Sequence, residues 1–191
     1  MKKLTALVST TLLAFYLSLS AQAAPILAFS NDGSAVNQAV TQGDNVSLEL
    51  WVSGLENVNL GGFDIELFFD PSVSLFQSAL FSAEWLDFSD LTIAGNRLSL
   101  ASVSSLFDLS TQPDSLLLAT LQFSAGAVGT SLVNFGSILL SDELAQPFST
   151  DWVAATIEVQ ANSTGIPEPQ TWLLLLFAVG LLKLQRSRTY R

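Results

Sequence analysis

Residues 24–161 contain a series of short runs, some apolar and others alternating between apolar and polar side chains, punctuated by turn-forming sequences. In one run, Val46, Leu48 and Leu50 alternate with polar residues. A period of two places successive side chains on opposite faces of a strand, so one face of each strand is expected to enter a core. The runs cover 25–29, 46–52, 61–69, 91–94, 97–103, 115–124, 131–140 and 152–160. Such a series predicts an all-β chain folded as a β-sandwich.

Turn sequences and apolar positions add detail to this prediction. Asn31-Asp32-Gly33 is typical of a turn, and Gly95-Asn96 between two runs predicts a two-residue hairpin. A helical pattern is suggested only over 78–88. The expected core contains Phe63, Ile65, Leu67, Leu121 and Phe123.

The N-terminal segment 1–23 has the features of a secretory signal peptide. Two lysines precede a mostly apolar stretch that ends in Ala21-Gln22-Ala23. A basic start, a short apolar core and a small-x-small ending are what signal peptidases recognise. Cleavage is therefore expected after Ala23, and the mature domain is expected over 24–161.

The C-terminal segment 166–191 follows a polar linker, 162–165, and has three parts in order. Pro167-Glu168-Pro169 comes first, and an apolar run that starts at Trp172 comes next. Eleven helical residues, 172–182, reach about 16 Å, which is about half of a bilayer core. The basic residues Lys183, Arg186, Arg188 and Arg191 follow, and positive charge keeps this end cytoplasmic. The segment predicts a short transmembrane helix, either a transient handle for processing or an ordinary single-pass anchor.

This order of motif, helix and basic end resembles the PEP-CTERM sorting tail. The resemblance covers residues 166–191 and rests on Pro167, Glu168 and Pro169 with the terminal arginines. It implies recognition by an exosortase, a membrane processing enzyme of Gram-negative bacteria that produce exopolysaccharide and biofilm. The implied route is an inner-membrane intermediate, followed by the cell surface or extracellular matrix.

The central domain resembles a cohesin. The sequence from Gly62 to Pro71, GFDIELFFDP, is similar to the opening half of such a domain. The stretches 118–123, 129–131 and 139–142 are similar to its closing half. The resemblance implies a jelly-roll sandwich of about nine strands. Cohesins bind dockerin modules, and some carbohydrate-binding modules share the fold.

Composition excludes several classes of function. The chain has no cysteine and no histidine, which removes disulfides, Cys/His zinc sites and histidine-based triads. Residues 24–166 hold sixteen acidic side chains and one basic residue, Arg97, a net charge of −15. Such a domain repels phosphate backbones, so nucleic acid is not an expected partner.

The acidic residues provide two kinds of candidate site. Asp64 with Glu66, and Glu84 with Asp87, are pairs that glycoside hydrolysis could use. However, alternation places Asp64 and Glu66 on the solvated face, so no catalytic residue is predicted. Calcium could take oxygens from loops, and solubilising loop acids are the alternative interpretation. The candidate calcium groups are Asp142, Glu143 and Asp151, or Asp87 with Asp90.

Aromatic residues provide the remaining candidates, because their rings can stack on sugars. The candidates are Trp51, Phe68 and Trp85, with Phe81 and Trp152 as further possibilities. Packing of these rings within the sandwich is the alternative. The sequence therefore predicts a non-enzymatic, exported surface or matrix protein without a cofactor, whose domain binds a surface protein or an extracellular polysaccharide. The alternative is a carbohydrate-binding module or part of a carbohydrate-active enzyme system.

Overall fold

The structure is a computed structural model that describes residues 23–86, 90–106 and 108–162. The chain divides into two compact units, Met1–Gln160 and Ala161–Arg191. The predicted signal peptide up to residue 22 and the predicted sorting tail lie outside the described residues. In the part that the structure describes, no helix has the length and apolar character needed to cross a membrane.

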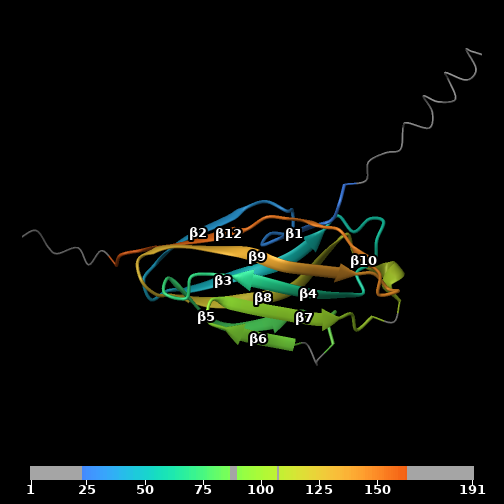
Figure 1. The fold of residues 1–191 in the computed structure, drawn as a ribbon. Helices are drawn as coiled ribbons and strands as arrows, with labels where there is room; N and C mark the ends of the chain where they lie inside the picture. Colours follow the sequence, from blue (N-terminus) through green and yellow to red (C-terminus); the bar gives the residue numbers. More distant parts are fainter. Residues whose placement is uncertain (1–22, 87–89, 107, 163–191) are drawn as a thin grey trace, which may run out of the picture. The chain divides into compact units, whose positions relative to one another are not determined.

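The described part of the first unit is a sandwich of two sheets (Figure 1). One has five strands in the order β11-β1-β3-β8-β5, and the other has seven, β2-β12-β9-β4-β7-β6, with β10 beside β9. The elements are β1 (Ile26–Ala28), β2 (Val36–Thr41), β3 (Asn45–Ser53), β4 (Gly62–Phe68), β5 (Ser74–Phe81), β6 (Asp90–Ala94), β7 (Arg97–Val103), the 3-10 helix η1 (Leu109–Thr111), β8 (Ser115–Ala125), β9 (Gly129–Ser141), β10 (Pro147–Phe148), β11 (Asp151–Trp152) and β12 (Ala155–Gln160).

The core lies between the two sheets and is built by the alternating side chains. In β3, Val46, Leu48 and Leu50 are buried and their polar neighbours are exposed. The expected core is confirmed, because all five of its predicted residues are buried. Burial of one face of strands such as β3 and β4 therefore holds the two layers together.

Two sequence expectations about the strands were wrong. The described residues form twelve strands rather than about nine, although β10 and β11 have only two residues each. The proposed helical pattern over 78–88 is also incorrect, since β5 occupies Ser74–Phe81 and pairs with β8. A register shift between Phe76 and Ser78 interrupts the period of two in β5. An interrupted alternation resembles a helical pattern in the sequence, which explains the error.

The two predicted turns are confirmed and have different local causes. The Gly95-Asn96 turn joins β6 to β7, with Ala94 paired to Arg97 and a φ of +66° at Gly95. Glycine takes this left-handed conformation at little cost. The other turn is closed by Asp32, whose carboxylate accepts the backbone N–H of Ser34 at 3.0 Å.

Hydrogen bonding in the second turn lowers the pKa of Asp32 from 3.8 to about 2. The largest cause is the hydroxyl of Ser34, followed by its backbone N–H and the Ser30 hydroxyl. A serine two residues later likewise lowers the pKa of Asp70 and of Asp108. These carboxylates stabilise their turns in the ionised form.

We expect the Asp32→Asn variant to lose part of the acid sensitivity of the wild type. The folded-state pKa of Asp32 is depressed, so its contribution is complete above about pH 4 and disappears as the pH falls towards about 2. The melting temperature of the wild type should therefore fall more steeply across that range than that of the variant. Parallel curves for the two proteins would contradict a stabilising role for this carboxylate.

Candidate binding faces of the sandwich

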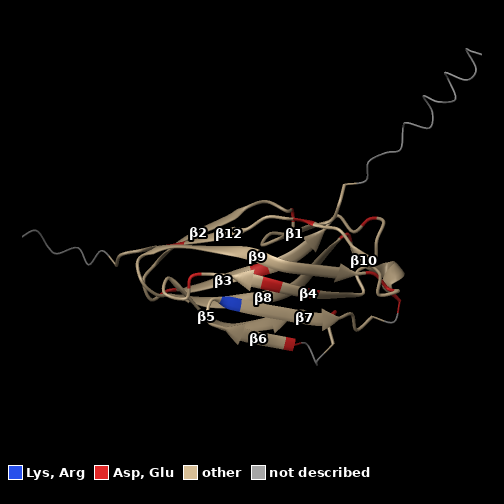
Figure 2. Cartoon of the chain, in the orientation of Figure 1, with Lys and Arg blue, Asp and Glu red and all other residues tan. Residues whose placement is uncertain are grey.

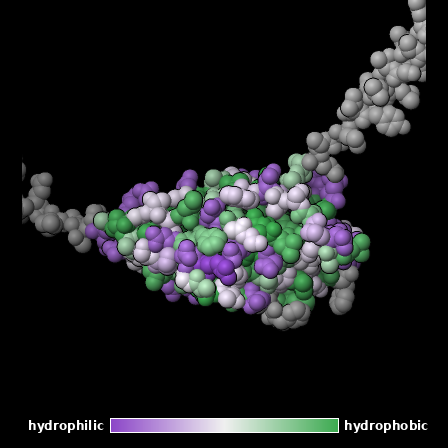
Figure 3. All heavy atoms as spheres, viewed as in Figure 1, coloured by the Kyte–Doolittle hydropathy of each residue, from purple (hydrophilic) through white to green (hydrophobic). Residues whose placement is uncertain are grey.

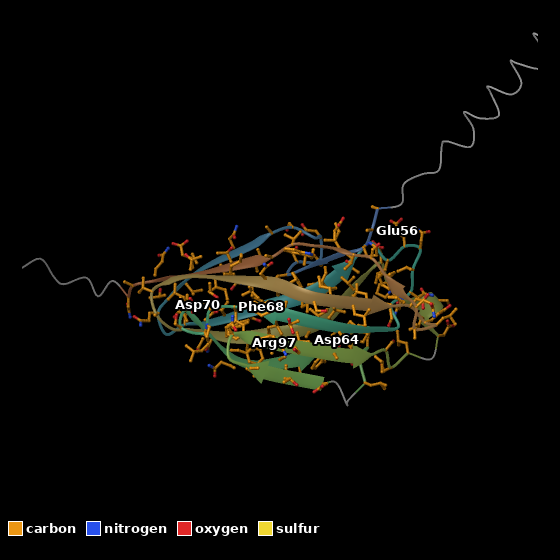
Figure 4. All side chains as sticks on the ribbon, viewed as in Figure 1. Glu56, Asp64, Phe68, Asp70 and Arg97 are labelled. Atoms are coloured by element: carbon orange, nitrogen blue, oxygen red, sulfur yellow. The ribbon has the colours of Figure 1, made fainter. Side chains whose placement is uncertain are left out.

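The outward face of β4 carries polar and aromatic side chains in the middle of the seven-stranded sheet. Asp64 is exposed, and Glu66 and Phe68 are half-buried. This confirms that Asp64 and Glu66 lie on the face away from the core. Figure 4 shows Asp64, Phe68 and Arg97 on the neighbouring strands β4 and β7.

Arg97 pairs with Glu66 across this face. A guanidinium nitrogen of Arg97 lies 3.1 Å from a carboxylate oxygen of Glu66, in the only ion pair among the described residues. In Figure 2 the single blue segment, on β7, lies beside red segments of β4. Such an exposed pair adds at most about 1 kcal/mol to stability, so its main effect is to fix the charge pattern of the face.

Phe68 and Glu66 both lie close to the backbone of β9 at Gly136. A Cβ atom added at Gly136 would come within 2.4 Å of the Phe68 ring and 2.9 Å of the Glu66 carboxylate. The absence of a side chain at this position lets the Phe68 ring approach the sheet. The ring is therefore partly covered by its own sheet rather than projecting freely from it.

A depression of about 290 Å³ lies on the same side of the sheet. It is lined by Asp64, Glu66, Asp90, Ser99, Ala101 and Ser137. The described carboxylates nevertheless form no group of three or more placed to hold a metal ion.

The expected calcium group of Asp142, Glu143 and Asp151 is not brought together by the fold. One carboxylate oxygen of Asp142 instead accepts the backbone N–H groups of Leu144 and Gln146 within its own loop. Asp87, which both the Glu84 pair and the Asp90 pair require, lies outside the described residues.

Moderate sodium chloride is expected to raise the melting temperature of the domain. The net charge of −15 over residues 24–166 causes self-repulsion, which added ions screen. At equal ionic strength, calcium should stabilise the domain no more than magnesium does, because screening of the net charge depends on ionic strength rather than on the identity of the cation. A selective rise in melting temperature with calcium in a thermal scan would contradict this expectation.

The aromatic candidates do not share one surface. Trp51 is half-buried on β3 of the five-stranded sheet, where its indole N–H donates to Glu49 at 3.0 Å. Phe68 lies on the opposite sheet. Phe81 is half-buried and stacks on the core ring of Phe63. Trp152 is exposed, and its ring centroid lies 5.9 Å from that of Phe135.

Trp85 is incorrectly predicted as a surface residue. It is only 4% exposed, and its indole N–H donates to the carbonyl of Leu117 at 3.0 Å. Its ring meets the Phe63 ring edge-on at 4.8 Å. Because the indole N–H of Trp85 is hydrogen-bonded and its ring is packed within the core, neither face of the ring is free to stack on a sugar.

Exposed aliphatic side chains are the feature that sequence analysis missed. Leu132 and Leu139 on β9 and Val103 on β7 are 53%, 51% and 47% exposed. All three occupy outward positions of the seven-stranded sheet. The signal was present in the sequence, since β9 has leucines where alternation calls for polar residues. Figure 3 shows apolar side chains interspersed with hydrophilic ones on the visible surface.

The chain was compared with known families and with solved structures. No family model matches the chain, and no curated protein matches it significantly. Solved cohesin structures do match. A non-cellulosomal cohesin from the archaeon Archaeoglobus fulgidus is 15% identical with a TM-score of 0.57, over 74% of this chain and 94% of that one. The seventh ScaB type I cohesin from Pseudobacteroides cellulosolvens is 10% identical with a TM-score of 0.59, over 76% and 97%.

A third structure is a type I cohesin–dockerin complex, Coh-OlpC–Doc435, from Clostridium thermocellum. It is 13% identical with a TM-score of 0.56, and the match covers 72% of this chain and 92% of that one. The agreement of three cohesins over almost their full length establishes the cohesin fold for the described domain. The sequence-based fold class is thereby confirmed.

Proposed function

We propose that this chain is an exported, non-catalytic binding protein whose cohesin-fold domain attaches to a partner protein outside the cell. The binding surface in this proposal is the β4 face, defined as the outward side of β9, β4 and β7. Its residues are Val103, Leu139, Asp64, Glu66, Arg97, Phe68 and Leu132. Export and display follow from the signal peptide and from the sorting tail that an exosortase would process.

The arrangement of apolar and charged groups on the β4 face carries this proposal. Leu139 on β9 lies opposite Asp64, and Val103 on β7 lies opposite Gly62, so exposed aliphatic side chains flank this end of β4 on both sides. At the other end of the face, Phe68 lies opposite Asn134, two residues from Leu132. Arg97 lies opposite Phe68 at this end, and its guanidinium pairs with Glu66, two residues before Phe68 on β4. Exposed apolar side chains next to a fixed charge pair are typical of a surface that binds a partner protein.

A protein partner is favoured over a polysaccharide by the placement of the aromatic rings. Sugar binding by stacking needs exposed ring faces on one surface, whereas Trp51 and Phe68 lie on opposite sheets and Trp85 is buried. The solved complex with Doc435 is a case in which a cohesin binds a protein. Polysaccharide binding, and membership of a carbohydrate-active enzyme system, remain the alternatives.

A charge introduced on the β4 face is expected to weaken partner binding strongly. The experiment uses the immobilised protein, with the extracellular protein fraction and the exopolysaccharide of its own cell as separate probes. Leu139→Lys should weaken capture of a specific protein about tenfold or more, because it places an unpaired charge in an apolar contact.

Leu80→Lys is the matched control, since Leu80 is 73% exposed on β5 of the opposite sheet. This variant should retain the protein that the wild type captures. Equal loss with both variants would contradict the β4 face as the binding surface. Retention of the polysaccharide alone would favour the carbohydrate-binding alternative.

A further inference from the structure

Strand β6 is an open edge of the seven-stranded sheet. It pairs with β7 on one side and, among the described residues, with no strand on the other. All five of its residues are exposed. The ladder to β7 runs through five successive pairs without a register shift. A regular, exposed edge is a template on which another strand can pair.

The core-side residues of β6 are incompletely covered. Leu91 and Ile93 pair with Leu100 and Leu98, both fully buried, and so lie on the core side of the sheet. They are nevertheless 37% and 52% exposed. Two apolar side chains thus extend the core face beyond the cover that the other sheet provides.

Several of the usual protections of an edge strand are missing from β6. The strand, DLTIA, contains no lysine and no proline, and it has no bulge against β7. The edge of the other sheet differs, because β5 has a register shift between Phe76 and Ser78. Such an irregularity disfavours pairing with a further strand.

The hydrogen-bonding groups of the edge can be assigned from the hairpin. Ala94 and Arg97 flank the two-residue turn, so the N–H and C=O groups of Ala94 point towards β7. The direction alternates along an antiparallel strand. The backbone groups of Leu91 and Ile93 therefore point to the open edge, from the same two residues whose side chains are incompletely covered.

We propose that β6 pairs with β6 of a second copy of this chain, antiparallel and centred on Thr92. In this register Leu91 lies opposite Ile93 of the second copy, and Ile93 lies opposite Leu91. The two-fold axis makes the contact self-complementary. It joins the two sheets into one and brings the four exposed aliphatic side chains together on the core side.

The charges on β6 agree with this register. Asp90 is the only charged residue of the strand, and it lies opposite Ala94 of the second copy rather than opposite another acid. The next strand of that copy holds Arg97, paired with Ala94 and 50% exposed. Asp90 thus approaches the only basic residue between positions 24 and 166. The net charge of each copy opposes association, so salt should strengthen the dimer.

A cysteine at the two-fold axis tests this pairing in the full chain, which has no cysteine of its own. Paired Thr92 residues face each other at a non-hydrogen-bonded position, where Cα atoms lie about 4.5 Å apart. This separation is within the range of a disulfide. Thr92→Cys should therefore form a disulfide-linked dimer on mild oxidation, seen on a non-reducing gel. Ser78→Cys, exposed on the edge strand β5, is the control and should remain monomeric.

Two further measurements test the register of the β6–β6 pairing and the contribution of its apolar side chains. A mixture of Asp90→Cys and Ala94→Cys should give the mixed dimer, whereas Asp90→Cys alone should not, because its two copies would be about 14 Å apart. Adding Ile93→Lys to Thr92→Cys should remove the dimer while the circular dichroism spectrum stays β-rich.

Cross-linking of Thr92→Cys no faster than that of Ser78→Cys would overturn the proposal. A dimer that persists unchanged with Ile93→Lys would also overturn it. The β6 edge and the β4 face are tested with different variants, so failure of either proposal leaves the other standing.

Discussion

Phe123→Ala is expected to destabilise the domain by about 3–5 kcal/mol, which is the typical cost of removing a buried aromatic ring. Phe123 lies on β8 and is 1% exposed. Its ring meets the rings of Phe69 and Phe76 edge-on, each at 5.5 Å between centroids. Phe69 follows β4 of one sheet and Phe76 belongs to β5 of the other, so the lost ring leaves a cavity between the layers.

Urea unfolding of residues 24–161 measures this effect. Domains are commonly stable by only about 5–15 kcal/mol, so the variant is expected to unfold at a much lower urea concentration. Leu80→Ala is the control and should change stability by about 0.5 kcal/mol or less, because Leu80 projects into solvent. Equal urea midpoints for the wild type and Phe123→Ala would contradict the position of the core.

Glu168→Ala is expected to change the final cellular location of the protein while the domain remains folded. Pro167 and Pro169 each lack a backbone N–H and restrict the residue before them, which favours an extended Glu168 ahead of the apolar run. A short extended motif beside a membrane helix is what a membrane-embedded processing enzyme could recognise. The variant should accumulate as a longer, membrane-retained form.

Neutralising Arg186, Arg188 and Arg191 together should have a similar effect, because the proposed topology relies on positive charge to keep this end in the cytoplasm. Cell fractionation with size analysis on a gel measures both outcomes. Gln185→Ala, which changes no charge within the same segment, is the control and should be processed like the wild type. Normal size and location for Glu168→Ala would contradict recognition of the motif.

The strands whose bounds sequence analysis placed best are those with strict alternation. β3, β4 and β7 each bury every second residue, so their boundaries could be placed within one or two positions. β5 was missed because its register shift breaks the period, and β2 was missed because its apolar residues are few and only half-buried. The local sequence pattern thus predicts strands that place side chains in the core. It fails for strands such as β2, where pairing with a neighbouring strand compensates for weak side-chain burial.

The candidate binding surface was predictable only in part. The outward positions of Asp64 and Glu66 follow from the alternation of β4. The burial of Trp85 does not follow from the sequence, since it depends on Phe63 and on the Leu117 carbonyl, which are distant in the chain. The separation of Trp51 from Phe68 depends on which strand joins which sheet. Strand order is a tertiary property that a single sequence does not reveal.

We propose that the folded domain is exported, released from both terminal segments and displayed outside the cell. Intact-mass spectrometry of the wild-type protein, isolated from its own cell, tests this most directly. The expected product begins at Ala24 and lacks residues 170–191. A product that retains residues 170–191 would make the tail a plain anchor and would contradict processing by an exosortase.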